Sequence, residues 1–324
     1  MTSSERSSPA AAPPLAAPPT AELSVVILNW NTADLLLACL RALARHSFAG
    51  SHEILVVDNG SSDGSADRVA AEFPGVRLVR NAANLGYSAG NNVGLRLARG
   101  RHILLLNSDT EVGPGALDRL VAFLDRHPRA GAVSCRLTHP DGSLQPSCMR
   151  FPTLATALVF DTFLGRLPAG RRHLDRYFMR DFDHAAEREV DQVPGTCTCV
   201  PRAVLREVGL LDERLWLFFN DVDLCRRIRA TGRTVHFLPD VSILHHHGAS
   251  TARFVYFAVE WHLNRVAYYR KHFGRASVLI TKPVALYVAL RQMWKFTVLR
   301  QVPPGSWCEN MRFVWRGLWR VLRS

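Results

Sequence analysis

The sequence predicts an α/β fold built on a parallel, doubly wound sheet. Between residues 23 and 124, short apolar segments rich in Val, Ile and Leu alternate four times with segments whose apolar residues recur at helical spacing. Two of the apolar segments end at acidic residues, and sheets of this kind bind ligands at the carboxyl ends of their strands. The sequence therefore predicts both a fold class and the edge of the sheet at which a site lies.

Four buried strands are expected in this region, because each apolar segment is short and continuous. They span residues 23–28, 53–57, 76–79 and 102–106. The helices between them place apolar side chains on one face, over residues 36–43, 66–73 and 117–124, and another helix is expected over 87–99. Gly90 and Gly94 weaken the prediction of that last helix.

The pattern changes after residue 130. A hairpin is expected over 135–147, turning at Pro140-Asp141-Gly142, and a short helix over 204–211. A strand over 234–238 runs into Pro239, and helices are expected from about residue 253 to the end. Residues 151–190 carry no pattern that assigns them.

Three parts are expected along the chain. Residues 1–21 are rich in Ala, Pro and Ser and lack aromatic side chains, so they predict a disordered tail without the apolar core of a secretion signal. Residues 22–252 form the α/β domain, and residues 253–324 form a basic helical extension. The seven cysteines have scattered spacings, which indicates reduced thiols in a cytosolic protein.

The charge of the extension favours a membrane surface. The whole chain has a formal net charge of +12, and Trp294, Trp307, Trp315 and Trp319 alternate with Arg and Lys near its end. Such a mixture favours an anionic membrane over nucleic acid, for which no motif is present. Residues 276–299 are broken by charges, so we expect a helix lying flat on the membrane rather than one spanning it. The alternative is a helix packed against the α/β domain.

Two carboxylates, Asp221 and Asp223, follow an aromatic run at the start of a predicted helix. A carboxylate held by free backbone N–H groups and partly shielded from water suits a general base. The alternative is an ordinary helix cap with a solvated neighbour, and for this segment alone that alternative is favoured.

Polar residues follow the second and third strands. Asp58 could accept hydrogen bonds from a ribose or a base, or it could close an Asx turn. The small and amide residues over 84–92 would let a ligand approach the backbone closely, although an ordinary loop would have the same composition. Asp109 could bind Mg²⁺ or Mn²⁺ beside a diphosphate, or cap a turn, and one histidine of 245–247 could join it.

Seven segments then appear in the order typical of one enzyme family. They are SVVILNWNTADLL (24–36), ILVVDNGSSDGS (54–65), NAANLGYSAGNNVGL (81–95), ILLLNSDTEV (103–112), PDGSLQPSCMRFPT (140–153), FFNDVDLCRRIRATG (218–232) and LHHHGAST (244–251). With these segments the chain resembles glycosyltransferase family 2, the inverting nucleotide-sugar transferases of the GT-A fold. It is most similar to the bacterial rhamnosyltransferase branch.

The resemblance implies a role for each matching residue. Asp221 would be the catalytic base, with Asp223 supporting the base or aligning the acceptor. Asp109 would bind Mn²⁺ or Mg²⁺, with His245 as the metal or diphosphate histidine and His246 as its substitute. The nucleotide would contact Asn29, Asp58, Asn84, Gly86, Asn91 and Asn107. Two positions depart from the family pattern, because Asn107 and Asn220 stand where the family has Asp and Glu.

The implied reaction is an inverting, metal-assisted transfer of a sugar from a nucleotide donor. The expected donor is dTDP-L-rhamnose, with UDP- and GDP-sugars as alternatives. The expected acceptor is a glycan or lipid-linked sugar, reached by a protein held peripherally on the cytoplasmic face of the plasma membrane. Two rivals remain: a non-catalytic nucleotide-sugar or glycan-binding protein, and a Rossmann-type oxidoreductase. The oxidoreductase is disfavoured because no G-x-G-x-x-G follows the first strand.

Overall fold

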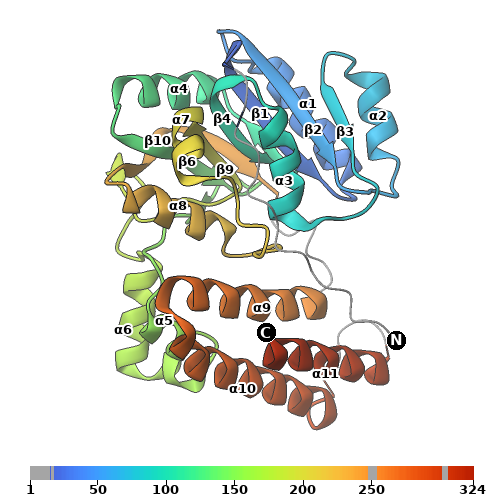
Figure 1. The fold of residues 1–324 in the computed structure, drawn as a ribbon, viewed down its shortest axis with the longest axis vertical. Helices are drawn as coiled ribbons and strands as arrows, with labels where there is room; N and C mark the ends of the chain where they lie inside the picture. Colours follow the sequence, from blue (N-terminus) through green and yellow to red (C-terminus); the bar gives the residue numbers. More distant parts are fainter. Residues whose placement is uncertain (1–14, 16–17, 247–253, 301–305) are drawn as a thin grey trace.

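The computed structural model describes Leu15 and residues 18–246, 254–300 and 306–324. A twisted sheet flanked by helices forms one layer, and helices from the middle and the end of the chain form a second layer beside it (Figure 1). Most of the predicted tail lies outside the described residues. Leu15 is buried, and its carbonyl accepts a hydrogen bond from the Arg206 guanidinium at 2.7 Å.

The first half of the sheet confirms the predicted alternation. Four parallel strands lie in the order β3-β2-β1-β4. They are β1 (Ala21–Asn29), β2 (His52–Asp58), β3 (Arg77–Arg80) and β4 (Gly100–Asn107). The connecting helices are α1 (Ala33–Arg45), α2 (Ser65–Glu72) and α3 (Gly86–Leu97). The carboxyl ends of these strands therefore share one edge, as expected.

The second half of the sheet is mixed. Its strands continue the order as β9-β6-β10-β5. They are β5 (Thr110–Val112), β6 (Ala130–Thr138), β9 (Cys197–Pro201) and β10 (Thr234–His245), and β9 is antiparallel to β4. Helices α4 (Ala116–Arg126), α7 (Arg202–Val208) and α8 (Asn220–Ala230) cover this half. The α/β class is confirmed, but the sheet is not parallel throughout.

The strand expected to stop at Pro239 continues to His245, so that boundary was wrong. The pairing of β10 with β6 changes register between Leu238 and Ser242, which marks a bulge that contains Pro239. At a bulge a proline does not have to donate a ladder hydrogen bond. The hairpin expected over 135–147 is confirmed, because β7 (Leu144–Gln145) pairs antiparallel with β6.

The second layer consists of two groups of helices. Residues 151–190, which the sequence left unassigned, contribute α5 (Leu154–Val159), the 3₁₀ helix η1 (Phe163–Arg166) and α6 (Pro168–Tyr177) to this layer. Their short strand β8 (Arg188–Glu189) instead pairs with β10 of the sheet. The predicted C-terminal helices are α9 (Phe254–Phe273), α10 (Val278–Thr297) and α11 (Trp307–Arg323), with the 3₁₀ turn η3 (Arg275–Ser277) after α9. Helix α10 packs on α5. Within the described residues, no helix is both long enough and apolar enough to cross a bilayer.

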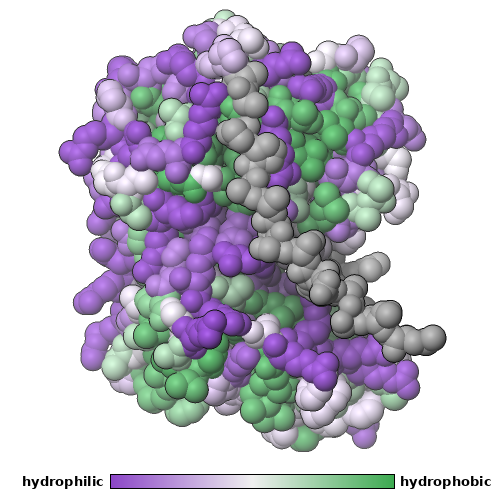
Figure 2. All heavy atoms as spheres, in the orientation of Figure 1, coloured by the Kyte–Doolittle hydropathy of each residue, from purple (hydrophilic) through white to green (hydrophobic). Residues whose placement is uncertain are grey.

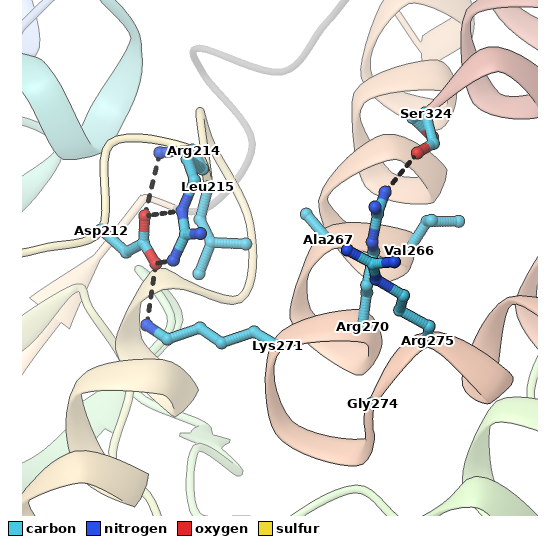
Figure 3. Close-up of a pocket in the computed structure, with 10 residues that line it drawn as sticks. All are labelled: Asp212, Arg214, Leu215, Val266, Ala267, Arg270, Lys271, Gly274, Arg275 and Ser324. Carbon is cyan, nitrogen blue, oxygen red and sulfur yellow. Dashed lines mark hydrogen bonds and ion pairs between the residues drawn. The ribbon is translucent and has the colours of Figure 1, made fainter. Parts of the chain in front are cut away.

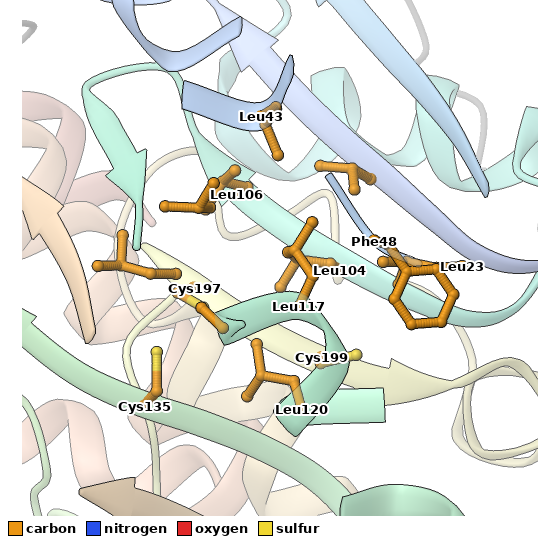
Figure 4. Close-up of a cluster of buried hydrophobic side chains, with 14 of the residues drawn as sticks. Leu23, Leu43, Phe48, Leu104, Leu106, Leu117, Leu120, Cys135, Cys197 and Cys199 are labelled. Carbon is orange, nitrogen blue, oxygen red and sulfur yellow. The ribbon is translucent and has the colours of Figure 1, made fainter. Parts of the chain in front are cut away.

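The sheet has an apolar core on each face. One core joins the strands to α1 and α4, and the other joins them to α3, α7 and α8. In the first core, Leu104 and Leu106 of β4 lie among Leu117 and Leu120 of α4 and three buried cysteines (Figure 4). All seven cysteines are free thiols; six are buried, and Cys308 on α11 is exposed.

Two glycines explain how closely α3 approaches the sheet. A Cβ atom at Gly94 would lie 2.5 Å from Cγ1 of Val26, and one at Gly90 would lie 2.6 Å from Cδ1 of Leu28. Both distances are shorter than carbon atoms tolerate, so α3 needs glycine where it crosses β1. The residues that weaken the helix prediction are thus the ones that let the helix pack.

We predict that Gly94→Ala lowers the free energy of unfolding by about 1–3 kcal/mol, because the added methyl group overpacks the contact with β1. In an exposed helix, alanine is more stabilising than glycine by about 1 kcal/mol. A net loss of stability in Gly94→Ala would therefore come from the packing contact itself. The measurement is urea denaturation. Gly75→Ala is the matched control, since its Cβ would meet nothing within 4 Å. A Gly94→Ala protein as stable as the parent would contradict this account.

Candidate active site

The polar ends of three neighbouring strands meet at one edge of the sheet. Asn29 of β1 pairs with Asp58 of β2, and Leu28 pairs with Asn107 of β4. Asp109 follows two residues after Asn107, immediately before β5. Four of the residues predicted for the site therefore begin from adjacent backbone positions.

Asn29 holds Asp58 rather than facing the open site. Its side chain has no exposed surface, and its Nδ2 donates to Asp58 Oδ1 at 3.2 Å and to Ser65 Oγ at 2.8 Å. The hydroxyl of Thr32 donates to Asn29 Oδ1 at 2.7 Å. The Ser61 backbone N–H donates to Asp58 Oδ2 at 3.1 Å, so the Asx turn, which was the alternative interpretation of Asp58, is present. Asn29 and this turn fix the direction of the Asp58 carboxylate.

The loop before α3 is organised by Asn59, which the sequence did not single out. Its Nδ2 donates to Asn84 Oδ1 at 2.9 Å, and its Oδ1 accepts from the Leu85 N–H at 3.1 Å. Gly86 has a φ of +83°, and a Cβ there would lie 2.4 Å from Nε1 of Trp216. The close approach to the backbone that was expected of a ligand is therefore made at Gly86 by Trp216 of the same chain. Asn91 is buried and donates to the Tyr87 carbonyl at 3.0 Å.

Asp109 and His245 lie side by side at the end of the sheet. Pairing of β10 with β5 sets His245 opposite Thr110, and His245 Nε2 lies 3.3 Å from Asp109 Oδ1. The other ring nitrogen, Nδ1, lies 2.9 Å from Gln145 Oε1, which fixes the orientation of the imidazole. The His246 ring instead contacts Glu111 at 2.9 Å, and His247 lies outside the described residues.

This pair has the chemistry of a partial site for a hard divalent cation. Carboxylate oxygen and imidazole nitrogen are suitable ligands, and Mg²⁺ and Mn²⁺ commonly complete their coordination with water and substrate phosphates. Both side chains are less than 10% exposed. Among the described residues, no group of three or more His, Cys, Asp and Glu side chains converges. The residues thus fit a cation that shares its coordination sphere with a phosphorylated ligand.

Asp221 lies in the first turn of α8 with its carboxylate fixed by the backbone. Its Oδ2 accepts from the Gly195 N–H at 3.1 Å, and its Oδ1 accepts from its neighbour Val222 at 2.8 Å. Burial raises the pKa of Asp221 above its ordinary value, and these hydrogen bonds only partly oppose that rise. Asp221 is therefore a better proton acceptor than an exposed aspartate would be.

Residues 195–196 connect Asp221 to the end of β4 that precedes Asp109. The Gly195 N–H donates to Asp221 Oδ2, and the Thr196 carbonyl accepts from the Asn107 N–H at 2.9 Å. The Tyr87 hydroxyl donates to the Gly195 carbonyl at 2.7 Å. The pKa of Tyr87 is raised by burial and then by the charges of Asp221 and Asp109, so this phenol lies within the field of both carboxylates.

The charge of Asp221 also acts on a second tyrosine, which belongs to the other layer. The pKa of Tyr177, at the end of α6, is raised by burial and then by the charge of Asp221. Neither tyrosine was predicted as a site residue. Tyr177 lies in the region that carried no assignable pattern, and the prediction for residues 84–92, which include Tyr87, used only their small and amide residues. Gln145 and Gly195 were also missed, because each contacts a residue that is distant in the sequence. Gln145 lies 100 positions from His245, and Gly195 lies 26 positions from Asp221.

Asp223 points away from this site. Its side chain has no exposed surface and contacts Arg227 at 2.9 Å, Lys271 at 2.5 Å and His272 at 2.7 Å. Burial alone would raise the pKa of Asp223, but His272, Arg227 and Lys271 together lower it. Its contacts link α8 to α9, beside a second contact in which Arg226 donates to the Tyr268 hydroxyl at 3.2 Å.

A basic cavity of about 530 Å³ adjoins this link. Asp212 and Leu215 form one wall, and α9 with the residues that follow it forms the other, bringing Arg270, Lys271 and Arg275 to the cavity (Figure 3). Lys271 reaches across to Asp212 at 2.8 Å. Asp212 is also bound by Arg214, so its negative charge is already compensated.

Comparisons of the sequence with known proteins identify a family and several relatives of this chain. The family described as "Glycosyltransferase like family 2" matches residues 18–262. The N-acetylglucosaminyl-diphospho-decaprenol L-rhamnosyltransferase of Mycobacterium tuberculosis is 32% identical over 214 residues, covering 62% of this chain and 68% of that protein. The low-salt glycan biosynthesis hexosyltransferase Agl10 of Haloferax volcanii is 24% identical over 239 residues, covering 72% and 70%.

Solved structures share the fold. The mannosyltransferase PcManGT from Pyrobaculum calidifontis, in complex with GDP-Man and Mn²⁺, aligns with a TM-score of 0.54 at 17% identity, over 97% of this chain and 78% of that chain. GalNAc-T7 with UDP, GalNAc and Mn²⁺ aligns with a TM-score of 0.52 at 15% identity, over 92% and 55%.

We predict that Asp223→Asn destabilises the protein by about 3–5 kcal/mol at pH 7, because it leaves buried cations without their counter-charge. Asp221→Asn, in the same helical turn, is the matched control and should leave stability almost unchanged, since burial disfavours its charge. The measurement is chemical denaturation of both variants. Equal stability of the two variants would contradict the link that we assign to Asp223.

The same contacts predict a pH dependence. The pKa of Asp223 is lower in the folded than in the unfolded protein, so its stabilisation is complete above the unfolded value of about 3.9 and is lost as the pH falls further. The stability difference between the parent and Asp223→Asn should therefore narrow as the pH falls below about 4. A difference that stays constant over this range would show that the charge of Asp223 is not responsible.

Proposed function

The chain belongs to the glycosyltransferase-like family 2 and has the fold of GT-A glycosyltransferases, and from this premise we propose that it transfers L-rhamnose from dTDP-L-rhamnose to a lipid-linked sugar. The name of the mycobacterial relative supports both the sugar and the class of acceptor. A UDP- or GDP-sugar is the alternative donor, which the ligands of the structural relatives favour.

The observation that supports the proposal is the connection of Asp221, through residues 195–196, to the strand end that carries Asn107 and precedes Asp109. Asp221 would accept the proton of an acceptor hydroxyl, whose oxygen then attacks the anomeric carbon of the donor. The bond from that carbon to the nucleoside diphosphate breaks on the opposite face, so the anomeric configuration inverts. The elevated pKa of Asp221 and its fixed orientation support the role of general base.

Asp109 and His245 would hold Mn²⁺ or Mg²⁺, with Gln145 orienting the imidazole. A bound cation would offset the charge that develops on the departing diphosphate. Asp58, Asn84 and Asn107 would form the nucleotide side of the site, whereas Gly86 and Asn91, which contact Trp216 and the Tyr87 carbonyl, would shape the loop behind it. Within it, Asn29 would act as a positioning residue behind Asp58. Asp223 would likewise position Asp221 by anchoring α8.

The cavity beside α9 supports an anionic acceptor. Arg270 and Arg275 line it, and its Asp212 is already paired. Arg270 donates to the Ser324 backbone oxygen at 2.7 Å, so Arg275 is the residue that would attract negative charge such as the diphosphate of a lipid-linked sugar. Lys271, which also lines it, binds Asp223 two positions along α8 from Asp221. A lipid-linked acceptor places the enzyme peripherally on the cytoplasmic face of the plasma membrane.

We predict that Asp221→Asn lowers kcat by roughly 10²–10⁴-fold while nucleotide binding survives, because an amide cannot accept the proton. The measurements are transfer to a sugar acceptor and isothermal titration with the nucleoside diphosphate. Asp67→Asn, an 81% exposed carboxylate in the first turn of α2, is the matched control. In the parent, kcat/KM should rise with pH through the elevated pKa of Asp221. Near-normal turnover of the variant would remove Asp221 from this role.

We predict that dTDP-L-rhamnose raises the melting temperature of the protein only with Mn²⁺ or Mg²⁺, because the cation joins Asp109 and His245 to the diphosphate. EDTA should abolish both this shift and transfer, and Asp109→Asn should weaken both. A panel of UDP-, GDP- and dTDP-sugars identifies the donor in the same assay. Full activity after chelation would overturn the assignment of Asp109.

A further inference from the structure

Helix α10 exposes a stripe of apolar side chains along its length. Leu279, Leu286, Leu290 and Trp294 recur at intervals of seven, four and four residues, which keeps them on one face of the helix. Leu279 is 76% exposed, and Leu290 and Trp294 are each 52% exposed. Soluble surfaces rarely carry so many large apolar groups in one row, and such rows mark contact surfaces.

A distant part of the chain extends this stripe. The ring of Phe163, in η1, lies 6.4 Å from that of Tyr287, the residue next to Leu286. Phe163 is 57% exposed and Leu167 is 49% exposed. Figure 2 shows hydrophobic residues at the edge of the molecule where α5 and α10 lie, with hydrophilic residues between the two layers. We call the six side chains, Phe163, Leu167, Leu279, Leu286, Leu290 and Trp294, the apolar face.

Basic residues border the apolar face. At about 100° per residue, Lys282 falls on one side of the α10 stripe, and Arg291 and Lys295 fall on the other. Residues 274–324 contain nine Arg and Lys but a single acidic residue, Glu309. An apolar stripe between two basic margins is typical of helices that lie in the surface of an anionic bilayer.

We propose that the apolar face is the surface by which the protein binds an anionic lipid bilayer, with Phe163 and Leu167 inserting beside α10. The inference rests on the proposed transfer to a lipid-linked acceptor and deepens it by assigning the surface and its orientation. The row of leucines would enter the boundary between headgroups and acyl chains, and the basic margin would face the lipid phosphates. A partner protein would need a long, flat acidic surface to match the same pattern.

The geometry sets how the site faces the bilayer. Helix α9 separates α10 from the sheet, and α10 forms the edge of the molecule farthest from β1 (Figure 1). Lys271 and His272 of α9 bind Asp223 of α8. Helix α9, which lies between α10 and the sheet, is therefore attached to the helix that carries Asp221. The acceptor would therefore approach from the side of the basic cavity.

Flotation with vesicles tests the proposal without any substrate. The full chain should float with vesicles of phosphatidylcholine containing roughly one third phosphatidylglycerol, and binding should fall with salt and with removal of the anionic lipid. Phe163→Asp and Leu290→Asp should each weaken binding roughly tenfold or more, since each removes one apolar side chain that would be buried in the bilayer. Leu85→Asp, an exposed leucine on the α/β domain, is the matched control. Unfolding curves confirm that each variant is folded.

Equal binding of the parent, Phe163→Asp and Leu290→Asp would overturn the proposal. So would a self-association, measured by sedimentation, that these variants abolish while vesicle binding remains. Transfer to a short water-soluble acceptor is measured separately, because it does not require the bilayer. Loss of vesicle binding with retained transfer therefore tests this surface, whereas absence of transfer in the parent would count against the proposed function alone.

Discussion

The buried carboxylate of Asp223 is the interaction on which the arrangement of the molecule depends. It has no exposed surface, and its charge is balanced by Arg227 of its own helix and by Lys271 and His272 of α9. Removing a charge from water is costly, so this carboxylate persists only where its partners are fixed. These contacts therefore help to fix the position of α8, which carries Asp221, and the attachment of α9, to which Arg226 of α8 also donates at the Tyr268 hydroxyl.

The remaining site follows from the order of strands. Parallel strands β1, β2 and β4 bring Asn29, Asp58 and Asn107 to one edge, and β9 enters antiparallel so that Gly195 and Thr196 reach that edge from the opposite direction. The bulge in β10 then allows a strand that contains proline to deliver His245 beside Asp109. Local sequence makes each element, and long-range pairing makes the site.

The sequence was sufficient for the features set by local patterns. Strands β1 to β4, the helices between them and the C-terminal helices could be predicted because periodicity records burial. The antiparallel course of β9 could not, since pairing between Cys197 and Leu106 leaves no local signal. The placements of Asn29, Tyr87 and Gln145 depended on the same distant contacts. The different surroundings of Asp221 and Asp223 were accessible in principle, because residues two apart on a helix do not face the same side.

The distribution of thiols has a practical consequence. Burial raises the pKa of Cys39, Cys148 and Cys225 to about 12, which leaves almost no thiolate at neutral pH, whereas Cys308 is exposed on α11. A maleimide dye would therefore attach selectively to the C-terminal layer of the native protein. The fluorescence of a dye on Cys308 would then report changes in the surroundings of the C-terminal layer, without introduction of a new cysteine.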